Sequence, residues 1–234
     1  MTFGSLFAGI GGMDLGLERA GMTCKWQVEI DPFARQVLAK HWPDVPKHDD
    51  VRTFPPTTPE DWHVDLIAGG FPCQDISYAG KGAGLAGERS GLWYEFARIV
   101  RDLRPRFVLV ENVSALLVRG LDAVLGTLAS MGFDAEWGCI PAAAVGAPHI
   151  RERVFLVAHR HHEIQPILSV DGEERRRMQA CDTREGWMLR EPQVGRVAHG
   201  IPDRVDRLKG LGNAVVPQVA EWIGRRILKA GGLT

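Results

Sequence analysis

Short apolar runs alternate with longer segments of helical periodicity along most of the chain. Apolar runs bounded by glycine, proline and polar residues are typical of buried strands, and their alternation with amphipathic helices is typical of βαβ units. The pattern therefore predicts an α/β fold with a mostly parallel sheet and helices on both faces. The predicted strands are residues 3–7, 25–30, 64–68, 107–110, 135–140 and 154–158, and the predicted helices are residues 13–20, 32–40, 92–103, 121–131 and 219–228.

Two segments interrupt this alternation. Residues 74–91 are rich in glycine and polar residues and are too long for an ordinary strand-to-helix connection, so we expect a mobile active-site loop. Residues 159–200 carry arginine clusters and few apolar residues, which predicts a small polar surface module. The chain is thus divided into a main domain (1–158), the module (159–200) and a C-terminal segment (201–234) that returns to the main domain.

Composition narrows the class of protein. The chain has 234 residues, 45% of them hydrophobic and 24% charged, which suits one globular domain with a small appendage. Its net charge of −1 divides into −5 over residues 1–150 and +4 over residues 151–234, so we expect a polyanion to bind to residues 151–234. No long apolar segment or export signal is evident, and we expect a cytoplasmic protein. The four cysteines are widely spaced and lack metal-ligand spacing, so we expect no structural metal site and no disulfide framework.

The first predicted strand runs into a glycine-rich turn formed by Phe7, Ala8, Gly9, Ile10, Gly11 and Gly12. In doubly wound folds such a turn lets a nucleotide-like ligand approach the backbone. A dinucleotide fingerprint needs a glycine where Asp14 stands, and a carboxylate there would oppose a pyrophosphate at the helix N-terminus. The turn therefore favours a ligand other than NAD or FAD. Glu29 ends the second strand, where a carboxylate can accept both hydroxyls of a ribose.

Cys73 follows the third predicted strand in a Gly-Gly-Phe-Pro-Cys-Gln turn, which places its thiol at the carboxyl end of a strand. Cys24 and Cys139 lie in or beside strand-like stretches, where a small buried hydrophobe is the ordinary explanation, and Cys181 lies in the polar module. Cys73 is therefore the candidate nucleophile, and a tight turn that contains an inert thiol is the alternative.

Glu111 closes the next predicted strand, so its carboxyl group should lie on the same rim as Cys73. A helix cap or an ion-pair partner is the alternative role. Arg151 and Arg153 precede the last predicted strand, and the two-residue alternation of a strand points both side chains the same way. They can clamp a base carbonyl or a phosphate, or they can be surface residues that flank a strand.

Taken in order, five motifs resemble the motif series of the DNA cytosine-5 methyltransferases; they are residues 7–12, 72–74, 111–113, 151–153 and 212–215. The resemblance covers residues 1–158 and 199–228. It implies the Rossmann-like fold of class I adenosylmethionine-dependent methyltransferases, with S-adenosylmethionine as methyl donor, double-stranded DNA as substrate and no metal. The module at 159–200 then corresponds to a reduced target-recognition region. We expect a monomer, with a restriction endonuclease as counterpart on the same DNA site.

The resemblance also assigns catalytic roles. Cys73 is the nucleophile that adds to C6 of a flipped-out cytosine, Glu111 binds and protonates N3, and Arg153 donates to O2. Arg151 supports that pocket and the loop that carries Cys73. A thiolate at C6 is needed because C5 is a poor nucleophile until the ring becomes enamine-like.

The resemblance implies a second set of residues for the methyl donor. In it Glu29 binds the ribose, Asp50 accepts from the adenine amino group and Leu92 lies near the donor. The set is Phe7, Ala8, Gly9, Gly11, Gly12, Glu29, Ile30, Asp50, Pro72, Leu92, Asn213 and Ala214.

Two departures from the family pattern leave alternatives open. His149 stands where the family commonly has glutamine, and the region between residues 158 and 199 is short for a recognition domain. The same chemistry on RNA is one alternative, and an inactive nucleic-acid-binding relative is another. A nicotinamide-dependent oxidoreductase is a third alternative, which Asp14 disfavours.

Overall fold

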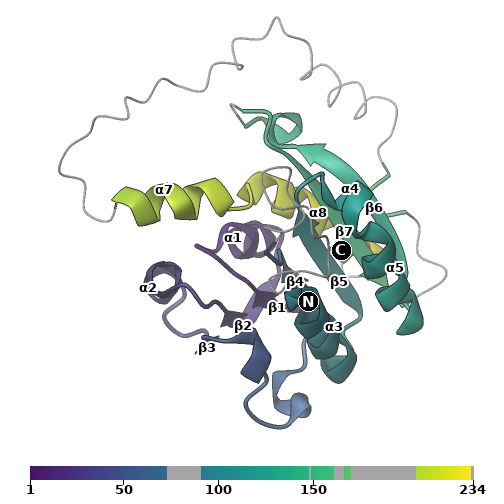
Figure 1. Ribbon diagram of the computed structural model, residues 1–234, viewed down its shortest axis with the longest axis horizontal. Helices are drawn as coiled ribbons and strands as arrows, with labels where there is room; N and C mark the ends of the chain where they lie inside the picture. Colours follow the sequence, from purple (N-terminus) through teal and green to yellow (C-terminus); the bar gives the residue numbers. More distant parts are fainter. Residues whose placement is uncertain (73–90, 148, 161–165, 170–203, 233–234) are drawn as a thin grey trace, which may run out of the picture.

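In the computed structural model of the protein, residues 1–72, 91–147, 149–160, 166–169 and 204–232 are described. These residues form a seven-stranded sheet in the order β3-β2-β1-β4-β5-β7-β6 (Figure 1). The strands are β1 (Thr2–Leu6), β2 (Thr23–Val28), β3 (Lys47–His48), β4 (Leu66–Gly69), β5 (Phe107–Asn112), β6 (Asp134–Pro141) and β7 (Glu152–His159). The helices are α1 (Gly12–Arg19), α2 (Pro32–His41), α3 (Leu92–Leu103), α4 (Leu116–Arg119), α5 (Leu121–Ser130), α7 (Arg204–Asn213) and α8 (Pro217–Ala230), with short 3-10 helices η1 (Val51–Thr53), η2 (Pro59–Trp62) and η4 (Ala142–Val145).

The sheet is mostly parallel, as the alternation of strands and helices predicts. The five neighbouring strands β3, β2, β1, β4 and β5 are parallel to one another, whereas β7 runs antiparallel to both β5 and β6. β1 lies between β2 and β4, so connections from the centre of the sheet leave in opposite directions. A crevice forms at such a switch point, outside the carboxyl ends of the strands.

Helices cover both faces of the sheet and form two separate cores. One core packs Trp93, Phe96 and Val100 of α3 and Val124 of α5 against strand residues that include Val108. The other packs side chains of α1, α2 and α8 on the opposite face, among them Leu17, Leu38 and Ile223. This is the two-sided layering expected of a doubly wound fold. None of the described helices combines the length and apolarity needed to cross a membrane.

Small residues bring α1 and α8 into unusually close contact. A Cβ added at Gly16 would lie 2.3 Å from the carbonyl oxygen of Pro217 and 2.5 Å from Cβ of Ala220. On the other helix, a Cβ at Gly224 would lie 2.8 Å from Cβ of Ala20. Since residues four apart lie on one helix face, small side chains at this spacing allow the two backbones to meet. α8 is thereby fixed against the helix that follows the glycine-rich turn.

Asp14 faces the interior rather than the strand ends, so the expectation that its carboxylate would oppose a pyrophosphate at the helix N-terminus is wrong. It is fully buried under α1, where it accepts hydrogen bonds from Ser5 Oγ (3.0 Å) and Gln27 Nε2 (2.8 Å). Burial raises the pKa of Asp14 to about 6, although these two hydrogen bonds partly oppose the shift. The helix turns this side chain inward because position 14 lies on the same face as Leu17.

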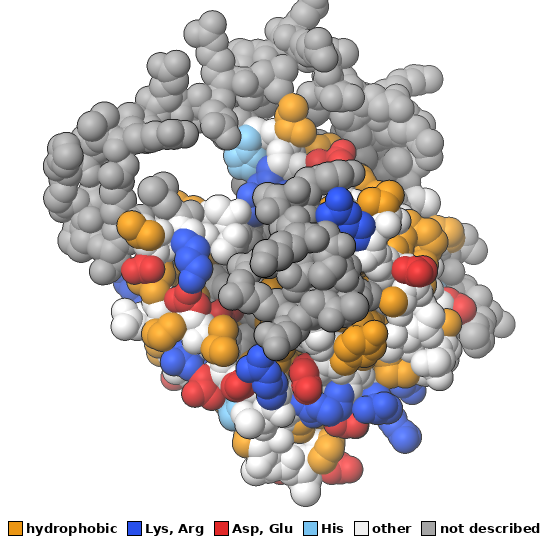
Figure 2. Space-filling view, in the orientation of Figure 1, with side chains coloured by type: hydrophobic (Ala, Val, Ile, Leu, Met, Phe, Trp, Pro, Cys, Tyr) orange, Lys and Arg blue, Asp and Glu red, His pale blue; other side chains and the backbone are white. Residues whose placement is uncertain are grey.

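Most helix and strand positions match the sequence prediction, with shifts at the ends. In the sequence, Asp31 followed by Pro32 predicts an N-cap and a first helical position. This cap of α2 is confirmed, since Asp31 accepts from the N–H groups of Phe33 (2.9 Å) and Ala34 (3.2 Å). The sequence prediction missed β3, α4 and α7. The predicted loop at 74–91 and most of the predicted module at 159–200 lie outside the described residues. Figure 2 shows acidic and basic side chains interspersed over the described part of one face.

Candidate active site

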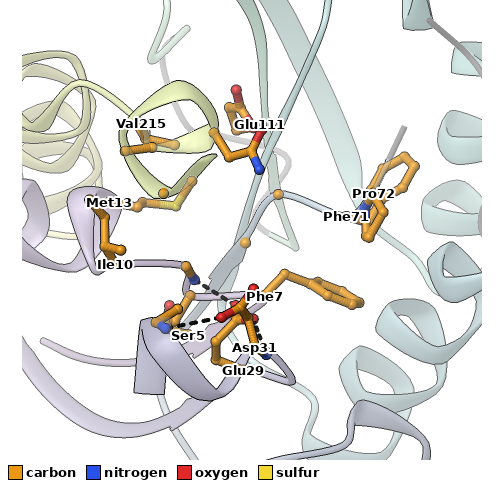
Figure 3. Close-up of a pocket in the computed structure, with 18 of the residues that line it drawn as sticks. Ser5, Phe7, Ile10, Met13, Glu29, Asp31, Phe71, Pro72, Glu111 and Val215 are labelled. Atoms are coloured by element: carbon orange, nitrogen blue, oxygen red, sulfur yellow. Dashed lines mark hydrogen bonds between the residues drawn. The ribbon is translucent and has the colours of Figure 1, made fainter. Parts of the chain in front are cut away.

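A cavity of about 400 Å³ opens at the carboxyl ends of β1, β2, β4 and β5 (Figure 3). Its volume lies within the range of roughly 300–1,000 Å³ that small-molecule pockets occupy. Its walls are the turn after β1, the start of α2, the turn after β4, the end of β5, Arg153 of β7 and the segment from α7 to α8. In Figure 3, Glu111 and Val215 lie across the cavity from Glu29 and Asp31.

The turn after β1 is held open by left-handed backbone conformations and by one carboxylate. Phe7, Gly9 and Gly11 have φ values of 54°, 57° and 83°. A side chain at Gly11 would also collide with Trp42, whose ring lies 2.4 Å from the position of a Cβ. Glu29 accepts from the N–H groups of Gly9 (2.7 Å) and Asp31 (2.8 Å). Glu29 is therefore oriented toward the cavity with lone pairs left to accept from a ligand.

The far end of the cavity contains a partly buried ion pair. Oε1 of Glu111, on β5, lies 3.1 Å from Nε of Arg153, on the neighbouring β7. Burial raises the pKa of Glu111 to about 7, although the charges of Arg153 and Arg151 oppose the shift. A carboxyl group with this pKa can give or take a proton near neutral pH. The pair is therefore a candidate acid/base group.

Two neighbours of Glu111 shape the turn that leads to Cys73. Asn112 is buried, and its side-chain amide donates to the carbonyl of Phe71 (3.3 Å) while its Oδ1 accepts from the N–H of Val113 (2.9 Å). A Cβ at Gly70 would lie 2.6 Å from Oε2 of Glu111. The glycine thus leaves room for the carboxyl group beside the turn. Cys73 itself lies outside the described residues, directly after Pro72 at the cavity wall.

Helix α7 closes one side of the cavity. Nζ of Lys209 lies 2.6 Å from Oδ2 of Asp31, so α7 is joined to the N-terminus of α2. Gly210 packs beside Ile10, since a Cβ there would lie 3.1 Å from the isoleucine side chain. Arg151 lies outside the cavity lining, and its Nη2 donates to the carbonyl of Ala214 (2.8 Å).

The structure brings most of the sequence-predicted residues together. Those that line the cavity are Phe7, Ala8, Gly9, Glu29, Ile30, Pro72, Glu111, Arg153, Asn213 and Ala214. Gly11 and Gly12 do not line it; Gly11 lies against Trp42, and Gly12 lies against the carbonyl oxygen of Val215. Asp50 instead accepts from the N–H of Arg52 (2.9 Å) at the start of η1, and Leu92, the first residue of α3, packs against the core. Neither Asp50 nor Leu92 lines the cavity.

Sequence reasoning missed several residues of the lining, among them Met13, Phe33, Lys209 and Gly210. Asp31 was assigned only as a helix cap, yet it also faces the cavity. A helix read over residues 204–213 would have pointed to Lys209. The two glycines and the charged residues of this segment weaken its helical pattern in the sequence.

Comparison with known proteins identifies relatives of the chain. A family model described as C-5 cytosine-specific DNA methylase matches residues 1–188. The type II methyltransferase M2.BsuMI of Bacillus subtilis is 36% identical over 175 residues, which cover 70% of this chain and 43% of that protein. M.HhaI of Haemophilus parahaemolyticus is 32% identical over 165 residues, covering 69% of this chain and 50% of that protein. The chain thus spans about half the length of these curated relatives.

Solved structures share the fold. A putative DNA modification methyltransferase encoded within a prophage of E. coli matches with a TM-score of 0.61 and 28% identity, over 71% of this chain and 49% of that one. The Entamoeba histolytica methyltransferase EhMeth matches over 98% of both chains with a TM-score of 0.70. Its identity of 13% makes this second match a likeness of fold alone.

Proposed function

Because the chain belongs to the C-5 cytosine-specific DNA methylase family, we propose that it transfers a methyl group from S-adenosylmethionine to C5 of cytosine in double-stranded DNA. The observation that carries the proposal is the Glu111–Arg153 pair. This pair places a carboxyl group with a pKa of about 7 in the lining of the cavity, and the opposite wall of the cavity is the glycine-rich turn.

On the side of the target base, Glu111 and Arg153 face the same end of the cavity. Glu111 in its protonated form gives a hydrogen to N3 of cytosine, and Arg153 donates to O2. Protonation at N3 draws electrons from the ring, so that the Cys73 thiolate adds at C6 and C5 becomes nucleophilic. C5 would then take the methyl group as the S–CH3 bond of the sulfonium breaks, with S-adenosylhomocysteine as the leaving group. Return of the N3 proton to Glu111 and loss of the C5 proton to a base would expel Cys73 and restore aromaticity. A water molecule is a suitable base for that proton.

On the side of the donor, the turn from Phe7 to Gly9 receives the ligand and Glu29 binds its ribose. Ile30, Pro72, Asn213 and Ala214 supply further walls. The donor supplies an electrophilic methyl group on a sulfonium, and no phosphate has to be accommodated. Asp50 and Leu92 stay in the proposal on their motif positions alone, because the cavity lining lacks them.

The target base must leave the duplex to reach this site, at a cost of about a few kcal/mol in unstacking. The contacts of Glu111 and Arg153 offset that cost. Methyl incorporation into duplex DNA and into transfer RNA, measured side by side, tests the substrate. Strong preference for RNA would favour the same chemistry on the other nucleic acid.

The covalent step has its own test. A DNA duplex with 5-fluorocytosine at a target site should trap a protein–DNA adduct in the presence of S-adenosylmethionine, because fluorine cannot leave as the proton does. Cys73→Ala should form no adduct and transfer no methyl group. An adduct with that variant, or none with the unaltered protein, would reject Cys73 as the nucleophile.

A cytoplasmic location, a monomeric state and a restriction endonuclease counterpart accompany this proposal as predictions. The relatives named as type II methyltransferases support the endonuclease counterpart alone. Mapping 5-methylcytosine in DNA from cells that express the protein would define the target sequence. Digestion of that DNA with an endonuclease of the same specificity would then test protection.

A further inference from the structure

Arg151 has a backbone conformation that its surroundings impose. Its φ is +30°, in the left-handed region that residues with side chains rarely adopt, and it stands directly before β7. The N–H of Ala142 donates to the carbonyls of Ile150 (2.7 Å) and Arg151 (3.3 Å). Strained residues of this kind gather at functional sites, where the neighbouring structure holds them in place.

The guanidinium of Arg151 joins two parts of the site. Nη2 donates to the carbonyl of Ala214 (2.8 Å), which lies in the cavity wall. Its charge also acts on Glu111 and opposes the rise in the pKa of that carboxyl group. Burial, followed by the neighbouring charge of Arg153, lowers the pKa of Arg151 itself. One side chain thus contacts the wall at residue 214 and stabilises the carboxylate form of Glu111.

The chain at residues 214 and 215 is held from two sides. The N–H of Ala214 donates to the carbonyl of Gly210 (3.0 Å), and Arg151 binds the Ala214 carbonyl. At the next residue, a Cβ at Gly12 would lie 2.2 Å from the carbonyl oxygen of Val215. This wall therefore contacts both the first residue of α1 and the Arg151 guanidinium, and its position depends on both.

We propose that Arg151 is a positioning residue that holds the Ala214–Val215 wall, and that it thereby sets the affinity for the methyl donor although it does not line the donor cavity. The inference rests on the proposed function, in which the cavity binds S-adenosylmethionine. It gives Arg151 a role apart from Arg153, which does line the cavity. Through its charge, the same residue also adds to the effect of Arg153, which opposes the rise in the pKa of Glu111 caused by burial.

Calorimetric titration with S-adenosylhomocysteine, without nucleic acid, tests the inference. Arg151→Gln should weaken binding at least about tenfold, which corresponds to about 1.4 kcal/mol. Arg151→Lys, which keeps a charged donor, should recover part of the affinity. Arg225→Gln is the matched control: this arginine of α8 pairs with Glu221 on the surface, and its loss should leave binding unchanged.

A second readout separates positioning from a general loss of structure. Arg151→Gln removes a positive charge near Glu111, so the pH at which turnover falls should move upward. If both Arg151 variants bind S-adenosylhomocysteine like the unaltered protein, the inference is overturned. Should Arg151→Gln not fold, Arg151→Lys is the test: weaker binding of S-adenosylhomocysteine than by the unaltered protein supports the inference, and equal binding overturns it. If the unaltered protein binds no S-adenosylhomocysteine, the proposed function fails instead.

Discussion

The carboxyl group of Glu111 occupies the space that a side chain at Gly70 would need. A Cβ on Gly70 would lie 2.6 Å from Oε2 of Glu111, and the same carboxyl group is fixed on its other side by Arg153 at 3.1 Å. The glycine before the Phe-Pro-Cys turn is thus required by the acid on the next strand. Flexibility of the turn is not needed to explain it.

Gly70→Ala should therefore impair the reaction at the cytosine, in which Glu111 takes part. The methyl must displace the Glu111 carboxyl group from Arg153, so we expect turnover to fall by about tenfold or more. Affinity for S-adenosylhomocysteine should change by less than about twofold, because Gly70 lies at the end of the cavity away from Glu29. Gly138→Ala on β6, where no atom lies within 4 Å of the added Cβ, is the control. Equal loss of donor binding would contradict this explanation.

The pKa of about 7 for Glu111 predicts a pH dependence of methyl transfer. Protonated Glu111 is the form that assists addition at C6, so kcat/KM should decline as the pH rises through about 7. Glu111→Gln should remove this descending limb and lower the rate by about 10²–10⁴-fold. Initial rates between pH 6 and pH 9 measure both effects. A limb that persists in the glutamine variant would assign it to another group.

Buried Asp14 predicts a pH dependence of stability. Its pKa is raised from 3.8 to about 6, so between these values the native state binds more protons than the unfolded state. Stability should therefore fall as the pH rises through this window, by ~3 kcal/mol if Asp14 acts alone. Asp14→Asn should flatten the dependence, as measured by urea unfolding from pH 4 to pH 7. An unchanged slope would show that another group is responsible.

The contact between α1 and α8 predicts opposite effects for two glycine-to-alanine changes. Gly16→Ala forces a methyl against the Pro217 carbonyl at 2.3 Å and should cost about 1–3 kcal/mol of unfolding free energy. Gly126→Ala, in the interior of α5 with no atom within 4 Å, should instead stabilise the protein by roughly 0.5–1 kcal/mol. Thermal unfolding of both variants tests the prediction. Equal shifts would mean that helix propensity alone decides.

The sequence by itself determined the order of strands and helices, the glycine-rich turn and the positions of Glu29, Glu111 and Arg153 near strand ends. These features follow from local rules, because hydrophobic period and capping residues act over a few positions. The cap at Asp31 is such a case. The motifs also carried the family resemblance, which the match over residues 1–188 confirms.

Tertiary structure alone decided which strands are neighbours and which way side chains near the site face. β7 pairs antiparallel beside β5, and this brings Arg153 to Glu111 from a position 42 residues later in the chain. Asp14 turned inward, and α7 joined the cavity through Lys209. Each of these depends on contacts between distant segments, whose free energy comes from packing, burial and charge. No local pattern of residues encodes such a contact.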